Sequence, residues 1–225
     1  MDVLTVNELE TDLRERFRTI ESPVTIAAEE VVQILHPANA DDLISEQDFA
    51  IDDRLPYWAD LWPSAVVLAR FLRGLRGEGR TLLELGCGSG AVATAAVRAG
   101  FTVTATDYYA DSPLFARANC WRNAQVDITV RCADWNAWPS DLRGYDLIVA
   151  SDVLYEQRNA PLIARVMAQS LGPRGEGWIA DPGRVGAASL PDWCASHALG
   201  CETVAKVPIE AGAHIHTITL YRITR

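Results

Sequence analysis

The chain is predicted to adopt an α/β fold: a Rossmann-like, doubly wound, seven-stranded and mostly parallel sheet with an antiparallel C-terminal hairpin, preceded by an N-terminal extension. Three observations predict it. From Arg80 onward, short apolar segments alternate with helical ones, as in βαβ units. A glycine-rich turn follows the first apolar segment. The last two strands are separated only by the turn-rich residues 208–214, which favours antiparallel pairing.

We divide the chain into an extension, residues 1–55, and a main domain, residues 56–225. Residues 5–20 carry apolar side chains at helical spacing and predict an amphipathic helix. Residues 23–35 favour either a strand or a short helix, and residues 36–56 are polar and proline-containing, which is typical of a loop. The extension is expected either to cover the functional site as a lid or to pack against the edge of the sheet.

The main domain is expected to begin with a helix over residues 62–77, in which Pro63 suits the first turn. Strands and helices then alternate toward the C-terminus. The expected strands are residues 81–86, 101–107, 126–134, 145–152, 175–181, 201–207 and 216–223, and the expected helices are residues 89–99, 111–123, 158–171 and 186–199.

The net charge of −10 is unevenly distributed. Residues 1–60 hold 15 acidic and 4 basic residues, whereas residues 61–225 hold 15 and 16. An acidic chain is a poor candidate for nucleic-acid binding. The sequence has no apolar run of membrane-spanning length and its N-terminus does not resemble a secretory signal. We therefore expect a cytoplasmic protein that acts away from membranes, and we favour a monomer.

Neither the cysteines nor the histidines form a recognisable ligand set. The five cysteines are odd in number and include no CxxC pair, which argues against a disulfide framework or a zinc site. His214 and His216 alternate on one expected strand, but no third ligand is evident. We expect no bound metal.

The strongest motif is the turn at residues 83–90, LELGCGSG. Glycines at this position allow a tight turn and close approach of a ligand to the backbone, at the strand ends where open α/β sheets bind ligands. The spacing is G-x-G-x-G, which differs from the dinucleotide fingerprint. Glu84 can anchor an ammonium, directly or through water, but is unfavourable beside a pyrophosphate. The motif, with Gly86, Cys87, Gly88 and Gly90, therefore favours S-adenosylmethionine over NAD.

Two further strand ends carry acids next to aromatic residues. Asp107 ends the second strand about twenty residues beyond the glycine turn, where a carboxylate accepts hydrogen bonds from a ribose diol. Tyr108 is expected near the adenine. Asp134 and Trp135 end the third strand, and they offer adenine an acceptor for its amine and a face for stacking.

The end of the fourth strand is expected to bring the substrate to the cofactor. Asp152 can attract a cationic amine or take its proton, and Tyr155 can shape the pocket or hold an ammonium by a cation–π contact. Ser151 is expected beside the cofactor, and Ala150 has no bulk to keep it from the strand end. The aromatic segment 56–63, which includes Trp62, either roofs the methionine end of the cofactor or plugs the gap between extension and core.

Together, the segments PYWADLWPSAVVLARFL, LLELGCGSG, TATDYY, ADWN and ASDVLYE resemble the seven-β-strand protein-lysine methyltransferases, which are class I S-adenosylmethionine-dependent enzymes. The chain is most similar to the branch that contains the electron-transfer flavoprotein β-subunit lysine methyltransferase and nicotinamide N-methyltransferase-like proteins. The resemblance covers about residues 55–225. It implies cofactor contacts from Trp62, Gly86, Cys87, Gly88, Asp107, Trp135 and Ala150, and a methyl-acceptor site at Asp152 and Tyr155.

The resemblance also implies the reaction, which is transfer of a methyl group to a nitrogen, most directly that of a lysine in a protein substrate. S-adenosylhomocysteine would be the product. Three alternatives remain: a small-molecule N- or O-methyltransferase, an NAD(P)-binding oxidoreductase, and a non-catalytic methyltransferase-like binding domain.

Overall fold

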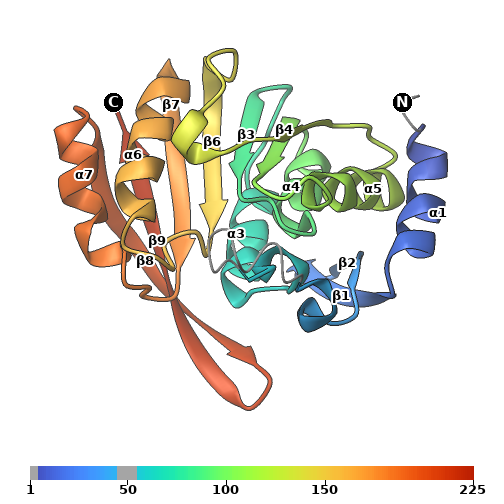
Figure 1. The fold of residues 1–225 in the computed structure, drawn as a ribbon. Coiled ribbons are helices and arrows are strands. Elements are labelled where there is room, and N and C mark those ends of the chain that lie inside the picture. Colours follow the sequence, from blue (N-terminus) through green and yellow to red (C-terminus); the bar gives the residue numbers. More distant parts are fainter. Residues whose placement is uncertain (1–4, 45–54) are drawn as a thin grey trace.

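In the computed structural model, which describes residues 5–44 and 55–225, the main domain is built on one sheet with the strand order β5-β4-β3-β6-β7-β9-β8 (Figure 1). The five strands β3 to β7 are parallel, and β9 runs antiparallel to both of its neighbours. The predicted seven-stranded sheet is therefore confirmed. The strands are β3 (Thr81–Leu85), β4 (Thr102–Asp107), β5 (Thr129–Cys132), β6 (Tyr145–Ser151), β7 (Leu171–Asp181), β8 (Gly200–Ala211) and β9 (His214–Thr224).

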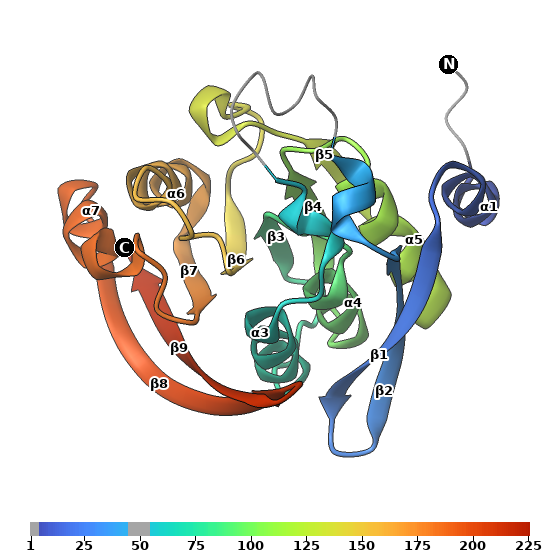
Figure 2. The same ribbon diagram turned by 60° about the horizontal axis from the view of Figure 1, so that its bottom comes forward.

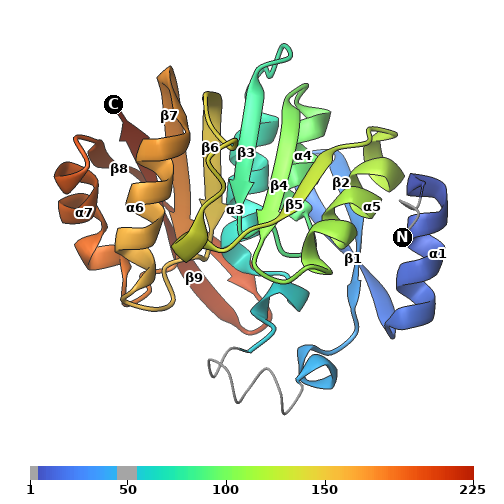
Figure 3. The ribbon, with the colours of Figure 1, turned by 45° about the horizontal axis from the view of Figure 1, so that its top comes forward.

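Helices cover both faces of this sheet (Figure 3). In β3, Leu82 packs in the apolar cluster that includes residues of α3, α4 and α5, whereas Leu83 and Leu85 pack in the cluster of α6 and α7. This alternation is the two-residue period of a strand. Burial on both faces explains why the strands read as continuous apolar runs. The helices are α3 (Pro63–Arg73), α4 (Ala91–Arg98), α5 (Ser112–Ala124), α6 (Asn159–Ser170) and α7 (Leu190–Ser196), with short 3₁₀ turns η3 (Trp135–Ala137) and η4 (Ala187–Ser189).

The C-terminal hairpin is longer than the sequence indicated. Most of residues 208–214, expected as a turn, belong to β8 and β9, and the turn itself contains Gly212 with φ of 60°. Only Thr219–Thr224 of β9 pair with β7, so the tip of the hairpin extends past the sheet as a two-stranded ribbon (Figure 1). Pro208 lies in β8, the edge strand, where a missing N–H is tolerated.

Three expected helices end or divide earlier than predicted. The helix expected over residues 62–77 ends at Arg73, before Gly74. The region 186–199 forms η4 and then α7, with Pro191 in the first turn of the second helix. The helix expected over residues 5–20 is α1 (Val6–Arg16). Within the described residues, no helix is long and apolar enough to cross a membrane.

The extension forms a small unit of its own elements. Residues 23–35, left open as strand or helix, belong to the antiparallel pair β1 (Thr19–Ala27) and β2 (Glu30–Pro37). The loop expected over residues 36–56 begins within the end of β2 and contains the short turn η1 (Ala40–Leu43), and η2 (Tyr57–Ala59) follows it. Its residues 45–54 lie outside the described residues.

The described part of the extension packs on the layer of helices α3 to α5 and not on the edge of the sheet (Figure 2). Apolar side chains of the β1–β2 pair contact α3 and α4, and Leu9 and Leu13 of α1 lie against Phe115 of α5. Both leucines are at most 1% exposed. The extension therefore adds a further layer outside helices α3 to α5 and shares apolar contacts with them.

Acidic side chains of the extension form ion pairs with arginines of the main domain. Glu21 lies 2.9 Å from Arg122, and Glu30 lies 2.6 Å from Arg73 and also pairs with Arg98. All three arginines belong to the helical layer. Because these side chains are partly exposed, each pair contributes about 0–1 kcal/mol. The pairs place the acidic extension against basic side chains of the domain.

We predict that Leu13→Ala lowers the free energy of unfolding of the whole domain by about 2–5 kcal/mol, because it removes a fully buried side chain. The control is Glu15→Ala on the exposed side of the same helix, which should change it by less than about 0.5 kcal/mol. Urea denaturation followed by fluorescence measures both. Equal stability of the two variants would show that α1 does not share the core.

Candidate active site

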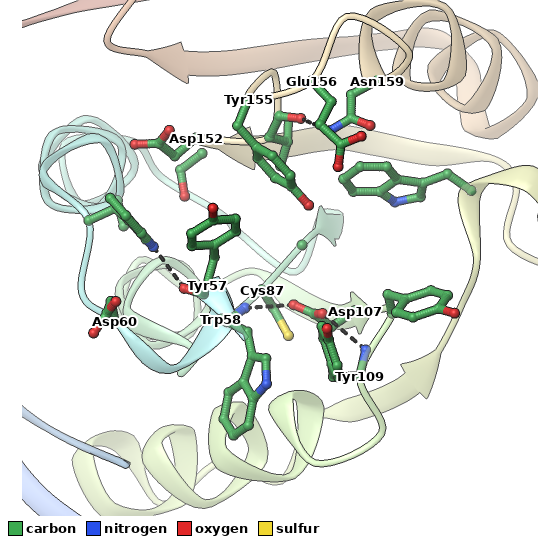
Figure 4. A pocket seen from close by; sticks show the side chains of 18 of the residues that line it. Tyr57, Trp58, Asp60, Cys87, Asp107, Tyr109, Asp152, Tyr155, Glu156 and Asn159 are labelled. Atoms are coloured by element: carbon green, nitrogen blue, oxygen red, sulfur yellow. Dashed lines mark hydrogen bonds between the residues drawn. The ribbon is translucent and has the colours of Figure 1, made fainter. Parts of the chain in front are cut away.

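A cavity of about 430 Å³ lies at the carboxyl ends of the parallel strands, beneath η2 and the start of α3 (Figure 4). This volume is within the range of small-molecule sites. Most of the residues that the sequence singled out line it: Trp62, Gly86, Cys87, Gly88, Gly90, Asp107, Tyr108, Asp134, Trp135, Ser151, Asp152 and Tyr155.

The glycine turn is held by hydrogen bonds from neighbouring elements. The Gly88 N–H donates to Asp107 Oδ2 at 3.0 Å, and Ser112 Oγ donates to the Gly88 carbonyl at 2.9 Å. Gly90 has φ of 83°, and a Cβ on it would lie 2.4 Å from the Cα of Ala116 in α5. The turn therefore requires glycine at residue 90, both for its conformation and for its contact with α5.

Buried Asn119 of α5 connects this turn to the extension. Its side-chain amide donates to the carbonyls of Ser89 and Leu35, both at 2.8 Å, and its oxygen accepts from the Leu35 N–H at 2.8 Å. Ser89 Oγ in turn donates to the Trp58 carbonyl at 3.4 Å. The turn, β2 and η2 are thereby fixed relative to one another.

Asp107 lies at the junction of the turn and the cavity. Its carboxylate is 7% exposed, and Oδ1 accepts from the Tyr109 N–H at 3.3 Å. Burial raises the pKa of Asp107, and hydrogen bonds from the backbone of Gly88 and the hydroxyl of Ser112 oppose this shift. The predicted ribose-binding carboxylate is thus on the cavity wall in a fixed orientation.

The proposed adenine side is built by the ends of β4 and β5. The ring of Trp135 lies against Gly86, where an added Cβ would be 3.6 Å from it. Asp134 accepts from the Asn136 N–H at 2.8 Å and so caps η3. The ring of Tyr108 is edge-on to that of Tyr109 at 5.5 Å.

Two residues predicted to touch the cofactor, Glu84 and Ala150, lie behind the described cavity wall, so their contact with the cofactor stays a prediction. Glu84 is 1% exposed, and its Oε2 has no hydrogen-bond partner among the described residues. Burial, and then the charge of Asp107, raise the pKa of Glu84 well above its ordinary value, which favours the neutral acid. Ala150 is fully buried beneath the strand ends. The sequence could not show this, because both faces of β3 and β6 are covered by helices and this burial depends on tertiary packing.

At the other end of the cavity, the Asp152 carboxylate already has partners. Oδ2 accepts from Ser64 Oγ at 3.2 Å, and Oδ1 accepts from Arg184 Nε at 2.6 Å. The carboxylate predicted to attract a cationic amine is therefore paired with a cation of the chain itself, and its role toward an acceptor stays a prediction. Sequence reasoning missed Arg184, although it follows Asp181, the last residue of β7, at the same edge of the sheet.

Aromatic rings surround this ion pair. The ring of Tyr57 lies 5.5 Å from that of Tyr155 and 6.0 Å from that of Trp62 (Figure 4). The Arg184 guanidinium lies 5.3 Å from the Trp62 ring centroid, a cation–π distance.

Segment 56–63 both lines the cavity and packs between the extension and the core, and its contact with a cofactor stays a prediction. Tyr57 and Trp62 form cavity wall, whereas the Trp58 ring packs with Phe17 of the extension and Phe115 of α5, at centroid distances of 6.4 and 5.5 Å.

The described lining also contains residues that the sequence did not single out for the site, and its charge is mainly acidic. Five carboxylates line the cavity with two arginines. Each arginine is paired with one of these acids: Arg184 with Asp152, and Arg158 with Glu156 at 2.5 Å. The additional lining residues include Tyr57, Asp60, Tyr109, Glu156, Arg158, Asn159 and Arg184.

The thiol of Cys87, in the glycine turn, is buried. Cys87 is 5% exposed, and burial raises the pKa of its thiol well above the ordinary value, which disfavours a nucleophilic thiolate. Across residues 5–44 and 55–225, no three His, Cys, Asp or Glu side chains are grouped to hold a metal ion.

Comparison with known proteins identifies similar chains. A family model described as a methyltransferase domain matches residues 57–204. The electron transfer flavoprotein beta subunit lysine methyltransferase of Danio rerio is 34% identical over 133 residues, which cover 57% of this chain and 51% of that protein. The chain thus spans about half the length of this relative.

Solved structures share the fold at low identity. The ribosomal protein L11 methylase of Lactobacillus delbrueckii subsp. bulgaricus superimposes with a TM-score of 0.60 at 21% identity, over 90% of this chain and 98% of that one. SMU.776, a putative methyltransferase complexed with SAH, gives a TM-score of 0.59 at 12% identity, over 73% of this chain and 50% of that one.

We predict that Gly90→Ala is far more destabilising than Gly79→Ala. Both glycines have positive φ, 83° and 78°, so both variants share the conformational strain. Only Gly90 has backbone within 4 Å of the added methyl group. Thermal unfolding should show a loss of more than about 3 kcal/mol for Gly90→Ala and about 1 kcal/mol for Gly79→Ala. Similar losses would mean that α5 does not press on the turn.

We predict that Glu84→Gln removes a pH dependence of stability. Because the folded state keeps the Glu84 proton to higher pH than the unfolded state, the free energy of unfolding should fall as the pH rises from 4.5 toward the raised pKa of the folded state. Gln has no such proton, so its stability relative to the native chain should rise over this window. Melting temperatures measured from pH 5 to pH 8 test this, and parallel curves would contradict it.

Proposed function

Since the chain belongs to the methyltransferase-domain family, we propose that it transfers the methyl group of S-adenosylmethionine to the side-chain amine of a lysine in a protein substrate. The membership confirms the resemblance seen in the sequence. The single observation that carries the cofactor proposal is the hydrogen bond from the Gly88 N–H to Asp107, which joins a glycine turn and a carboxylate at one edge of the cavity.

The chemistry of the lining fits S-adenosylmethionine. Asp107 offers acceptors to a ribose diol, and Asp134 with Trp135 offers an acceptor and a ring face to adenine. The glycine turn allows the methionine end to approach the backbone. In the neighbour complexed with SAH, a related cofactor form is bound on the same fold.

The same lining argues against the oxidoreductase alternative. A dinucleotide would bring a pyrophosphate to a cavity wall with five carboxylates, and the two arginines there are already paired with acids. An uncompensated anion beside these acids is unfavourable.

The bound cofactor supplies a methyl group on a sulfonium, which is a good leaving group. The task of the protein is then to position the acceptor, an effect worth several kcal/mol, up to about 7–11 kcal/mol in favourable cases. The wall at the acceptor end is formed by Trp62, Tyr57 and Tyr155. Asp152 contributes a negative charge to this end of the cavity. Protons are expected to leave the amine through solvent.

Two observations support a protein acceptor over a small molecule. The relative from Danio rerio is named as a lysine methyltransferase of a protein subunit. Tyr57 and Tyr155 are 41% and 36% exposed, so the acceptor end meets the surface, where a side chain of a folded partner can reach it.

We predict micromolar binding of S-adenosylmethionine by calorimetry and no binding of NADH. Asp107→Ala should weaken the affinity by about 10–100-fold, because charge-assisted hydrogen bonds contribute about 1.5–3 kcal/mol. Asp152→Ala, with its fold verified by circular dichroism, should leave cofactor affinity close to the native value and abolish methyl transfer.

Transfer is measured with radiolabelled S-adenosylmethionine and fractionated lysate. Label on protein lysines supports the proposal, whereas label only in the metabolite fraction would favour a small-molecule methyltransferase. Loss of both binding and transfer in Asp152→Ala would make Asp152 a cofactor or structural residue. A preference for NADH would overturn the assignment.

A further inference from the structure

Arg184 occupies the place at which a cationic acceptor would meet Asp152. Its Nε donates to Asp152 Oδ1 at 2.6 Å, and its guanidinium lies 5.3 Å from the centroid of the Trp62 ring. The Tyr57 ring lies 6.0 Å from that of Trp62. A carboxylate together with two aromatic rings is the environment that proteins use to hold an alkylammonium. In this structure, the chain's own arginine fills that environment.

The Asp152 carboxylate requires a cation. Its side chain is 5% exposed, and within residues 5–44 and 55–225 the only other side-chain hydrogen bond to its carboxylate comes from Ser64 Oγ at 3.2 Å. A buried carboxylate without a positive partner is unfavourable. Arg184 already supplies this cation at Oδ1, so an acceptor amine that binds at Asp152 competes with Arg184.

The position of Arg184 on its loop permits the exchange. Asp181 accepts hydrogen bonds at 2.7 Å from the backbone N–H groups of Gly183 and Arg184, which fixes the main chain. The Arg184 side chain is nevertheless 35% exposed, so it borders solvent on one side. Its departure from Asp152 thus needs rotation of the side chain and no movement of the backbone.

We propose that Arg184 is an internal placeholder for the acceptor's ammonium, and that the pocket formed by Asp152, Trp62, Tyr57 and Tyr155 binds an alkylammonium group by displacing it. This inference rests on the proposed amine acceptor and adds a residue that sets its selectivity. A tethered guanidinium competes at a high effective concentration, so only an acceptor with further contacts to the protein displaces it. Free amines and unrelated lysines are rejected on this basis.

The test uses n-butylammonium, which has the head group and stem of a lysine side chain, and calorimetry on the full chain without cofactor. Arg184→Ala should bind n-butylammonium at least about tenfold more tightly than the native protein, because the internal competitor is gone. Arg184→Lys retains a cation and should bind as the native protein does. Arg131→Ala removes an arginine that lies outside the cavity lining and pairs with Asp141, and it should also leave binding unchanged.

Two further measurements keep the test decisive. n-Butyrate, an anion of the same length, should bind neither form, and Asp152→Asn introduced into Arg184→Ala should abolish the gain for n-butylammonium. Arg184→Gln, which can still donate a hydrogen bond to Asp152, replaces Arg184→Ala if that variant does not fold. Binding of n-butylammonium that is no tighter in these variants would overturn the proposal, and so would binding of n-butyrate by the native protein.

The outcomes separate this inference from the proposed function, because the measurement requires neither cofactor nor turnover. Binding of S-adenosylmethionine without the gain in n-butylammonium affinity would leave the methyltransferase assignment standing and make Arg184 a fixed part of the wall. Tighter n-butylammonium binding in the Arg184 variants without binding of S-adenosylmethionine would support the cation site and overturn the proposed reaction.

Discussion

The cavity depends on the geometry of the turn between β3 and α4. The turn brings main-chain groups to the carboxyl edge of the sheet. Two hydrogen bonds hold its shape, because the Gly88 N–H donates to Asp107 and the Gly88 carbonyl accepts from Ser112 Oγ. Asp107 is therefore a structural residue and a ligand candidate at once. At Gly90, α5 lies so close that no side chain fits. A tight turn, a nearby helix and a carboxylate at the end of β4 are one connected arrangement.

The same turn explains why the extension is bound so firmly to the domain. Asn119 joins Ser89 to Leu35 of β2, and His36 joins β2 to η2 through Nδ1, which lies 3.1 Å from the Ala59 carbonyl. Burial lowers the pKa of His36, so the neutral imidazole is favoured, with Ser22 Oγ 2.9 Å from its Nε2. The extension thus supports the segment that carries Tyr57 and Trp62, which differs from the packing against the sheet edge that the sequence left open.

Sequence alone could predict the parts of this structure that follow from local rules. Alternating apolar segments gave the strands, and because the carboxyl ends of parallel strands meet at one edge, acids such as Asp107, Asp134 and Asp152 could be expected around one site. The partners of those acids could not be predicted. The pairing of Asp152 with Arg184 and the burial of Glu84 depend on tertiary packing, which no periodicity encodes. The helix boundaries were wrong for a different, local reason: α3 ends before Gly74, and α7 begins with Pro191 in its first turn.

The acceptor end has two opposed tasks, because a lysine binds as an ammonium but attacks as a neutral amine. A carboxylate such as Asp152 favours the charged form and so raises the pKa of an amine beside it, which helps binding and hinders attack. On our proposal, the displaced Arg184 remains attached to a backbone that Asp181 holds in place. Exchange with Arg184 then excludes amines that bind weakly, and the carboxylate holds the acceptor as its ammonium until the proton leaves through solvent.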